Sequence, residues 1–320
     1  MELPPPLRRA VDRALTGAAL SDIAAAAGDL SHRYREERRE NGFHVATERD
    51  ALAYLAVRLP ATYAAVRASL AAVAEARPDF LPKTLLDAGA GPGTGLWSAV
   101  DAWPTIADAM LVEGSTIFRR LGEQLASEAD LPHTVWRTTD ITADSIGSAP
   151  RDLVTLAYVL NELAPETQPP LVQRLWDVTA DILVIVEPGT PAGWQRILAA
   201  RRQLISAGAC IVAPCPHAHD CPLQAPDWCH FAERVARSRL HRQAKGGEVP
   251  WEDEKFSYVA VSRRAAKAAR ARVIARPRKG SGRVTLKLCR SDGSAADQFY
   301  SRRDGAQYKR ASRAHWGSSL

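Results

Sequence analysis

The first 80 residues carry apolar side chains at the spacing of amphipathic helices. Three stretches rich in Ala, Leu, Glu and Arg show this period, residues 23–29, 30–41 and 50–59. Thr47 precedes Asp50 by three residues, the spacing of a helix-capping box, so a helix is expected to begin there. The pattern predicts a helical N-terminal region over residues 1–80.

From Lys83 onward, short apolar runs alternate with longer helical stretches. Five runs are expected to be strands, residues 84–88, 109–113, 134–137, 153–156 and 182–187. Most of the segments between them, roughly 20 residues long, can form crossover helices. A later apolar run, 256–262, is expected to return to the same sheet. The pattern predicts a Rossmann-like α/β domain with helices on both faces of a parallel sheet.

Two segments depart from this alternation. Residues 208–254 are rich in Pro, His and Cys and have no regular period. Residues 272–289 suggest short strands around a Gly-Ser-Gly turn, followed by a polar end. We therefore expect a helical region (1–80), a domain over 81–263 with a Cys-rich insertion at about 208–254, and an extension over 264–320.

Charge is segregated along the chain. Residues 263–320 hold 16 Lys and Arg against three acids, a net charge of +13, whereas the first 262 residues hold 26 basic and 33 acidic residues, a net charge of −7. Such segregation favours a local surface for a polyanion such as RNA. The alternative is a solvated, disordered tail.

The sequence offers no sign of membrane insertion or secretion. No segment approaches the about 18 uncharged apolar residues that a membrane helix needs. The N-terminus lacks the apolar stretch of a secretory signal, and Glu2 and Asp12 are unusual for an Arg-rich transit peptide. We expect a cytoplasmic, monomeric protein without a membrane partner.

A glycine-rich loop follows the first expected strand. The sequence TLLDAGAGPGTG places Asp87 at the strand's end, and Gly89, Gly91, Gly93 and Gly95 before a helical stretch. Glycine lets a ligand lie against bare backbone, and the first N–H groups of a helix lack partners within it. The loop therefore predicts a cofactor site.

Polar side chains follow the next three expected strands. Glu113 ends the second, where a carboxylate can accept hydrogen bonds from ribose hydroxyls. Asp140 follows the third, where adenine contacts are expected, and Asn161 follows the fourth. Open parallel sheets bind ligands at this carboxyl edge, so these side chains are expected to line the same site as the loop.

The Asp-x-Gly-x-Gly-x-Gly order, with Pro92 inside it, resembles S-adenosylmethionine methyltransferases more than dinucleotide dehydrogenases. The resemblance implies an S-adenosylmethionine site made by Asp87, Gly89, Ala90, Gly91, Gly93, Glu113, Asp140 and Asn161. A dinucleotide site and an empty loop are the alternatives. Enzymes that methylate amino groups usually carry a four-residue motif after the fourth strand: Asn or Asp, two prolines and an aromatic residue. This chain has Asn161-Glu162-Leu163-Ala164 at that place, which does not match the motif.

Four of the five cysteines lie between Cys210 and Cys229, and Cys289 follows 60 positions later. Four thiolates suit a tetrahedral zinc ion or a cubane iron–sulfur cluster. Structural zinc sites favour cysteine pairs two to four residues apart, and this chain has none. Prolines after Cys215 and Cys221 suit a cluster shielded from water, so the cluster is favoured.

Other uses of these residues stay open. Zinc could be bound with the help of His217, His219 or His230. Pro214-Cys215 is similar to the nucleophile of RNA cytosine-carbon methyltransferases, although that nucleophile normally follows the fourth strand. Cys210 lies in an apolar run and is expected to be a core residue.

Several motifs together resemble the Rsm-type small-ribosomal-subunit methyltransferase-like family. They lie between Tyr54 and Cys289 and are YLAVRLPATYAAV, LLDAGAGPGTG, YVLNEL, APCPH, CPL, WCHF and EDEKFSYVAVSR. The resemblance implies a 4Fe–4S site at Cys215, Cys221, Cys229 and Cys289.

The same resemblance implies a partner in small-subunit ribosomal RNA or the pre-ribosomal small subunit. It implies RNA methylation, ribosome assembly or both, and no catalytic base or nucleophile is evident in the sequence. The alternatives are a non-catalytic assembly factor with structural zinc, and a small-molecule methyltransferase, which the +13 extension disfavours.

Overall fold

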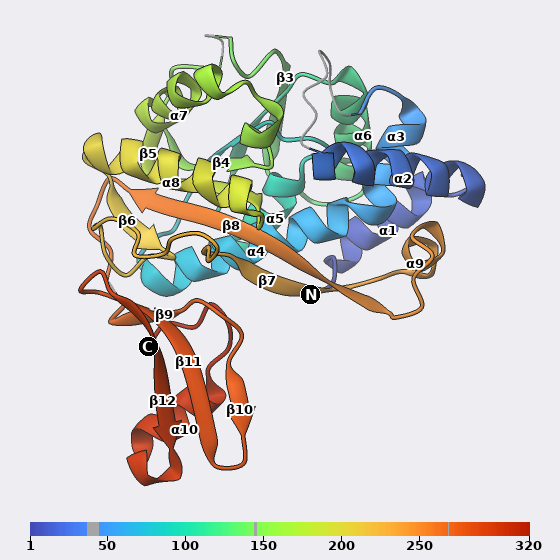
Figure 1. The fold of residues 1–320 in the computed structure, drawn as a ribbon. Helices are drawn as coiled ribbons and strands as arrows, with labels where there is room; N and C mark the ends of the chain where they lie inside the picture. The colour runs from blue at the N-terminus through green and yellow to red at the C-terminus, as the bar shows by residue number, and fades with distance from the viewer. Residues whose placement is uncertain (37–44, 144–145, 268) are drawn as a thin grey trace.

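A computed structural model describes residues 1–36, 45–143, 146–267 and 269–320 of the chain (Figure 1). Its centre is an eight-stranded sheet in the order β3-β2-β1-β4-β5-β8-β6, with β7 also paired to β8. The strands are β1 (Thr84–Ala88), β2 (Asp108–Glu113), β3 (His133–Thr138), β4 (Arg151–Ala157), β5 (Thr179–Pro188), β6 (Cys210–Ala213), β7 (Phe231–Ala236) and β8 (Trp251–Ser262). All six strands that the sequence predicts are confirmed.

The sheet is parallel from β3 to β5, and β8 runs antiparallel to β5, β6 and β7. Strand β1 pairs with β2 along one of its edges and with β4 along the other, so the chain first builds the sheet outward through β2 and β3 and then returns to the opposite side of β1. The strand order therefore reverses at β1 and β4, and the crevice beyond their carboxyl ends is where such sheets bind ligands.

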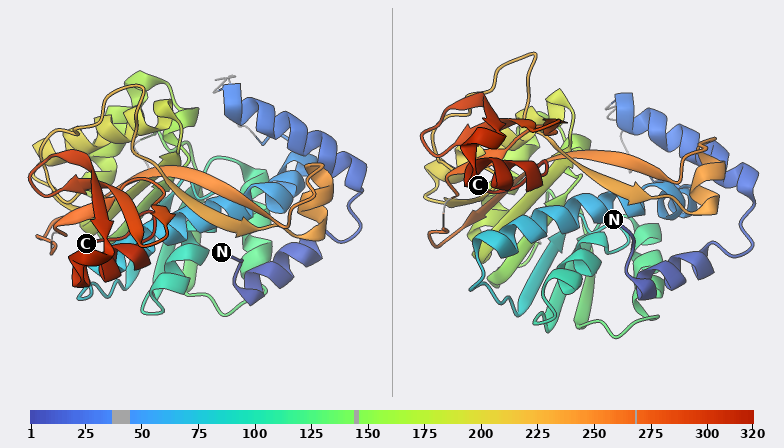
Figure 2. Two further views of the ribbon diagram at one scale, coloured as in Figure 1. Left: turned by 60° about the horizontal axis from the view of Figure 1, so that its bottom comes forward. Right: turned by 90° about the horizontal axis from the view of Figure 1, so that it is seen from below.

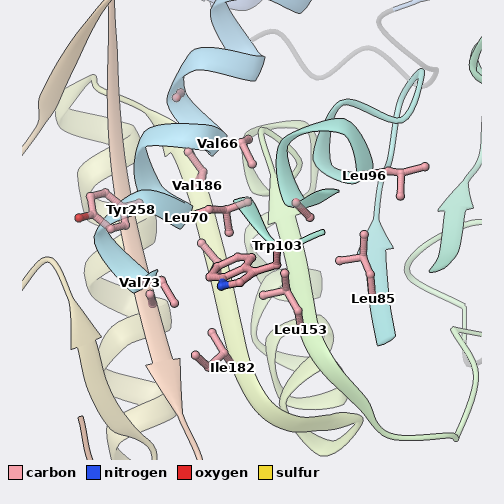
Figure 3. Close-up of a cluster of buried hydrophobic side chains, with 14 of the residues drawn as sticks. Val66, Leu70, Val73, Leu85, Leu96, Trp103, Leu153, Ile182, Val186 and Tyr258 are labelled. Carbon is pink, nitrogen blue, oxygen red and sulfur yellow. The ribbon is translucent and has the colours of Figure 1, made fainter. Parts of the chain in front are cut away.

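Helices cover both faces of the sheet, as the sequence predicts. On one face lie α4 (Leu59–Ala76) and α5 (Thr94–Ala102), and Figure 3 shows Leu70 of α4 and Trp103 packed over Leu153 and Ile182. On the other face lie α7 (Gln168–Asp177) and α8 (Pro191–Ser206), which bury a second core that includes Trp176. Apolar residues alternate between these two cores along β1, β2, β4, β5 and the second half of β8, as expected for strands buried on both faces.

The N-terminal helices form a third cluster at the end of the sheet near β3. They are α1 (Pro5–Ala14), α2 (Leu20–Glu36) and α3 (Glu48–Val57), and they pack with α6 (Thr116–Ala126). The capping box is confirmed, because the Thr47 hydroxyl accepts from the Asp50 amide at 3.1 Å and the Asp50 carboxylate accepts from the Thr47 amide at 3.1 Å. The expected helix over 30–41 extends outside the described residues after position 36.

The Cys-rich segment is more regular than its sequence suggests. It contains β6, β7 and α9 (Arg239–Ala244), and β7 with the first half of β8 forms a long hairpin. The hairpin carries α9 at its tip, beside α2 (Figure 2). The connection between β6 and β7, residues 214–230, lacks helix or strand, and it carries three of the cysteines.

The C-terminal extension is a folded module rather than a disordered tail, so the tail alternative is wrong. A second sheet in the order β10-β11-β12 also has β9 on β11, and it lies below the main sheet in Figure 1. Its elements are β9 (Ala271–Val273), β10 (Arg278–Gly280), β11 (Arg283–Arg290), β12 (Ala295–Ser301) and α10 (Ala306–Arg313). They enclose a small core of their own. Within the described ranges, no helix is both long and apolar enough to span a membrane.

Candidate cofactor site and cysteine cavity

The glycine loop connects β1 to α5 at the point where the strand order reverses. Gly89, Gly91 and Gly93 have φ of 68°, 54° and 86°, a left-handed region that favours glycine. A Cβ on Gly89 would lie 2.4 Å from Cγ2 of Val159, whereas a Cβ on Gly91 would meet no atom within 4 Å. Gly91 therefore presents bare backbone to open space, where a ligand can approach.

Asp87 supports this loop from beneath. Its side chain is buried, and Oδ1 accepts a hydrogen bond from the Thr155 hydroxyl at 2.7 Å. A Cβ on Gly95 would lie 2.4 Å from both carboxylate oxygens, so the first turn of α5 sits directly on them. Burial raises the pKa of Asp87 to about 7. The contacts that the structure records for Asp87 therefore hold the loop in shape, and direct contact with a cofactor stays a prediction.

Glu113 at the end of β2 lies beside the loop, as the sequence predicts. Its Oε2 accepts from the Gly91 amide at 2.7 Å, and its Oε1 accepts from the Ser115 amide at 2.7 Å. Burial raises the pKa of Glu113. Each carboxylate oxygen can accept more than one hydrogen bond, so Glu113 retains capacity for a ligand hydroxyl.

The other two predicted contacts differ in their surroundings. Asp140 is exposed, and its Oδ1 accepts from the amide and the hydroxyl of Thr142, both at 2.7 Å. Asn161 is buried in η1 (Leu160–Glu162), just past β4. Its Oδ1 has no hydrogen-bond partner among the described residues, and a buried amide oxygen of this kind is rare without a donor.

Glu162 is not among the site residues predicted from the sequence, although the structure brings its carboxylate near those of Glu113 and Glu187. Burial, together with the negative charges of Glu113 and Glu187, raises the pKa of Glu162 to about 8. Glu187 is tied down by Arg196 Nε at 2.8 Å and by the Leu160 amide at 3.0 Å. A cation placed among these carboxylates would relieve their mutual repulsion.

The four cysteines predicted as metal ligands line one cavity. Cys215 and Cys221 come from the connection between β6 and β7, Cys229 precedes β7, and Cys289 lies on β11. The other side chains that line the cavity are mostly apolar and come from α8, the β6–β7 connection, β7, β8 and residue 274: Trp194, Ile197, Leu198, Arg201, Pro214, His217, Leu223, Phe231, Ser257, Tyr258 and Ile274. Cys210 does not line the cavity and is half-buried in β6, so its expected full burial is not observed.

Burial dominates the chemistry of these thiols. It raises the pKa of Cys289 to about 12, and it also raises the pKa of Cys221 and Cys229. Without a ligand they are neutral thiols at pH 7, because a buried charge is costly. In the part of the chain that is described, no group of three or more His, Cys, Asp or Glu is arranged to hold a metal ion. The metal therefore stays a prediction.

The histidines differ in their distance from the cavity. Nε2 of His217 lies 3.3 Å from Sγ of Cys289, and burial lowers the pKa of His217. His219 stacks on His217 with ring centroids 5.7 Å apart, and His230 stacks on Trp228 at 4.9 Å. Of the three, only His217 lines the cavity with the cysteines.

The donor set fits a thiolate-bound metal group. Thiolates select soft metals, and a largely apolar lining excludes the water that would hydrolyse or hydrate such a group. The four cysteines also join distant parts of the fold, since Cys289 belongs to the second sheet and the other three belong to the β6–β7 connection of the first. Two further contacts hold these parts together, Arg272 Nε to the Pro214 carbonyl at 3.0 Å and an ion pair between Lys287 and Asp227.

The C-terminal extension, residues 264–320, is here called the basic module, and its aromatic side chains between the basic residues were candidates for stacking on RNA bases. Tyr300 and Tyr308 pack against the core of the small sheet, and Trp316 packs against the main core and His230. All three rings are half-buried, so only part of each is available to stack on bases, and their role in RNA binding stays a prediction. Phe299 is the exception, because 55% of its surface is exposed.

Residues 48–320 match a protein family described as mitochondrial small ribosomal subunit Rsm22. The match covers most of the chain, from α3 to the C-terminus. The chain belongs to the Rsm22 family. The glycine loop and all four cysteines lie within the matched range, so the Rsm-type resemblance is confirmed.

Relatives of this Rsm22-family chain include the human protein named ribosome assembly protein METTL17, mitochondrial. The two are 29% identical over 299 residues, which cover 86% of this chain and 63% of the human protein. Rsm22-cox11 tandem protein 2, mitochondrial, of Schizosaccharomyces pombe is 23% identical over 335 residues, which cover 85% of this chain and 43% of that protein. The chain thus spans less than two thirds of the length of these relatives.

Solved structures with a similar arrangement include magnesium protoporphyrin IX methyltransferase from Synechocystis PCC 6803 with bound S-adenosylmethionine. It is 15% identical, with 78% of this chain and all of that chain covered and a TM-score of 0.44. The N-methyltransferase NodS from Bradyrhizobium japonicum WM9, in complex with S-adenosylhomocysteine, is 13% identical, with 61% and 84% covered and a TM-score of 0.41.

Proposed function

We propose that this Rsm22-family chain binds S-adenosylmethionine and acts on small-subunit ribosomal RNA, in methylation, in ribosome assembly or in both. The observation that carries the proposal is the open backbone of Gly91, hydrogen-bonded to Glu113 where the strand order reverses. Membership of the family supports the ribosomal partner, as does the name of the human relative.

The carboxylates beside the loop suit this cofactor, which would supply a methyl group on a positively charged sulfonium. Glu113 would accept from the ribose hydroxyls, and the buried oxygen of Asn161 lacks a donor that a ligand could provide. Glu162 adds negative charge nearby when it is ionised. Methyl transfer can proceed by alignment of acceptor and donor without a base, so a catalytic base is not required.

A thiolate-bound 4Fe–4S cluster, held by Cys215, Cys221, Cys229 and Cys289, is part of the proposal. Four thiols around one cavity are the ligand set of such a cluster, and zinc is the alternative. Its expected role is structural, because these ligands join the second sheet to the main domain.

The part of the second sheet around Thr285, beyond the end where Cys289 lines the cavity, is the proposed RNA surface. On β11, Val284, Leu286 and Leu288 are buried, so the alternate residues face the other side of the sheet. Thr285 on that side pairs with Arg278 of β10 and with Phe299 of β12. A largely exposed guanidinium and an exposed ring thus share one row across three strands, which suits phosphate binding beside base stacking.

Replacing three exposed arginines of this module, Arg276, Arg278 and Arg283, by Ala is expected to weaken binding to small-subunit RNA and to flatten its salt dependence. Each lost phosphate contact lowers the slope of log K against log salt by about 0.7–0.9, so the slope should fall by roughly two to three. Fluorescence anisotropy over a series of salt concentrations measures it.

The matched control replaces three exposed arginines elsewhere, Arg9, Arg202 and Arg239, which changes the net charge equally. The control should retain the wild-type slope. Equal slopes in all three proteins would contradict the RNA surface, and S-adenosylmethionine affinity should be the same in all of them because the loop lies in the other sheet.

A further inference from the structure

Three arginines among the described residues are buried, and they differ in what balances their charge. Arg77 lies 3.2 Å from the Asp181 carboxylate and 2.9 Å from that of Asp79. Arg272 has the Glu75 carboxylate at 4.0 Å. No carboxylate in the described part of the chain pairs with Arg201, although it is only 2% exposed. A buried charge without an opposite charge is strongly destabilising, so we expect this guanidinium to have an anionic partner.

The surroundings of Arg201 indicate where that partner belongs. Arg201 lies on α8 and lines the cavity together with the four cysteines. One of its terminal nitrogens donates to the carbonyls of His217 and His219, at 2.9 and 2.8 Å. Its Nε has no hydrogen-bond partner among the described residues. The guanidinium therefore holds the backbone between Cys215 and Cys221, and its charge faces a cavity lined by thiols.

We infer that Arg201 supplies the buried positive charge that balances a thiolate-bound, anionic iron–sulfur cluster in this cavity. The inference rests on the cluster of the proposed function and adds a role for a residue that is not a ligand. Four thiolates outweigh the charge of a cubane core, so the whole group is an anion in a largely apolar cavity. Charge near a cluster helps to set its reduction potential, and a cation stabilises the reduced, more negative form.

The test separates the charge of Arg201 from its hydrogen bonds. Arg201→Gln removes the charge and keeps an amide that can donate to a carbonyl, whereas Arg201→Lys keeps the charge. The control is Arg202→Gln, since Arg202 is the next residue on α8 and is exposed. Each protein is purified without oxygen, and its cluster is titrated with a reductant while electron paramagnetic resonance follows the reduced form.

Arg201→Gln is expected to shift the midpoint potential of the cluster to more negative values. At a fixed potential the ratio of oxidised to reduced cluster should rise about tenfold, which corresponds to a shift of about 59 mV for one electron. Arg201→Lys should shift it much less, and Arg202→Gln should match the wild type. A second readout is the melting temperature with and without the cluster. Loss of the counter-charge should lower the melting temperature of the loaded protein more than that of the metal-free protein.

Two results would overturn the inference. If Arg201→Gln keeps the wild-type potential, the guanidinium does not balance the charge of the cluster. If it lowers both melting temperatures equally, its role is confined to holding the 217–219 backbone. A wild-type protein without iron and sulfide would instead overturn the cluster itself, and this is observed before any variant is compared.

Discussion

Gly91→Val is expected to weaken S-adenosylmethionine binding by roughly 10- to 100-fold. Its backbone φ of 54° disfavours a β-branched residue, and the side chain would fill the open space in front of the loop. Crowding of the ligand by the new side chain costs about 1–3 kcal/mol, and each 1.4 kcal/mol is tenfold in affinity. The strain of the left-handed backbone is present with and without the ligand, so it lowers stability rather than affinity. Isothermal titration calorimetry measures the affinity directly.

Gly208→Val is the matched control for backbone strain. Gly208 also has a positive φ, 83°, and a Cβ there would meet no atom within 4 Å, but it follows α8 and lies outside the loop. Its variant should lose stability and keep the wild-type affinity for the cofactor. Equal loss of affinity in both variants would show that strain, rather than a blocked site, weakens binding.

Replacing any one of Cys215, Cys221, Cys229 and Cys289 by Ser is expected to remove the brown colour of anaerobically purified protein. The wild type should contain about four iron and four sulfide per chain, as a cubane cluster requires. Because metal-binding energy is also folding energy, each variant should melt at least about 5 °C lower. Absorbance, iron and sulfide assays and calorimetry provide the measurements.

Cys210→Ser is the control, because Cys210 lies on β6 and does not line the cavity. It should keep the colour and the metal content. A colourless wild type with one zinc ion would replace the cluster by the zinc alternative. The Cys289→Ser variant should also become more sensitive to proteolysis in residues 264–320, since Cys289 is the ligand that the second sheet contributes.

The sequence predicts the main sheet well because its central strands β1, β2, β4 and β5 are buried on both faces. Five apolar runs and the strand that returns to them lie within observed strands, and the loop after β1 is recognisable from its glycines. By contrast, β7 and the first half of β8 form a hairpin that buries few side chains, so their polar sequences do not resemble buried strands.

The candidate sites were harder to predict where they depend on register. Cys289 faces the cavity only because β11 pairs with β12 and β9 in one register, and a shift by one residue would turn it to the other face. The same register places Tyr300 opposite Val284, where it is half-buried, and leaves Phe299 exposed. Glu162 is placed among the other carboxylates by a turn in which Tyr158 has a φ of 59°, which the sequence does not indicate.

Mapping RNA crosslinks of the native protein, with methylation read at the same nucleotides, tests the central claim most directly. Crosslinks are expected to concentrate on small-subunit ribosomal RNA, with crosslinked peptides from residues 276–287 of the basic module. Methylation that disappears with Gly91→Val would establish catalysis, and crosslinks to unmodified nucleotides would indicate an assembly factor. Crosslinks scattered over unrelated RNA, or none from the basic module, would contradict the account.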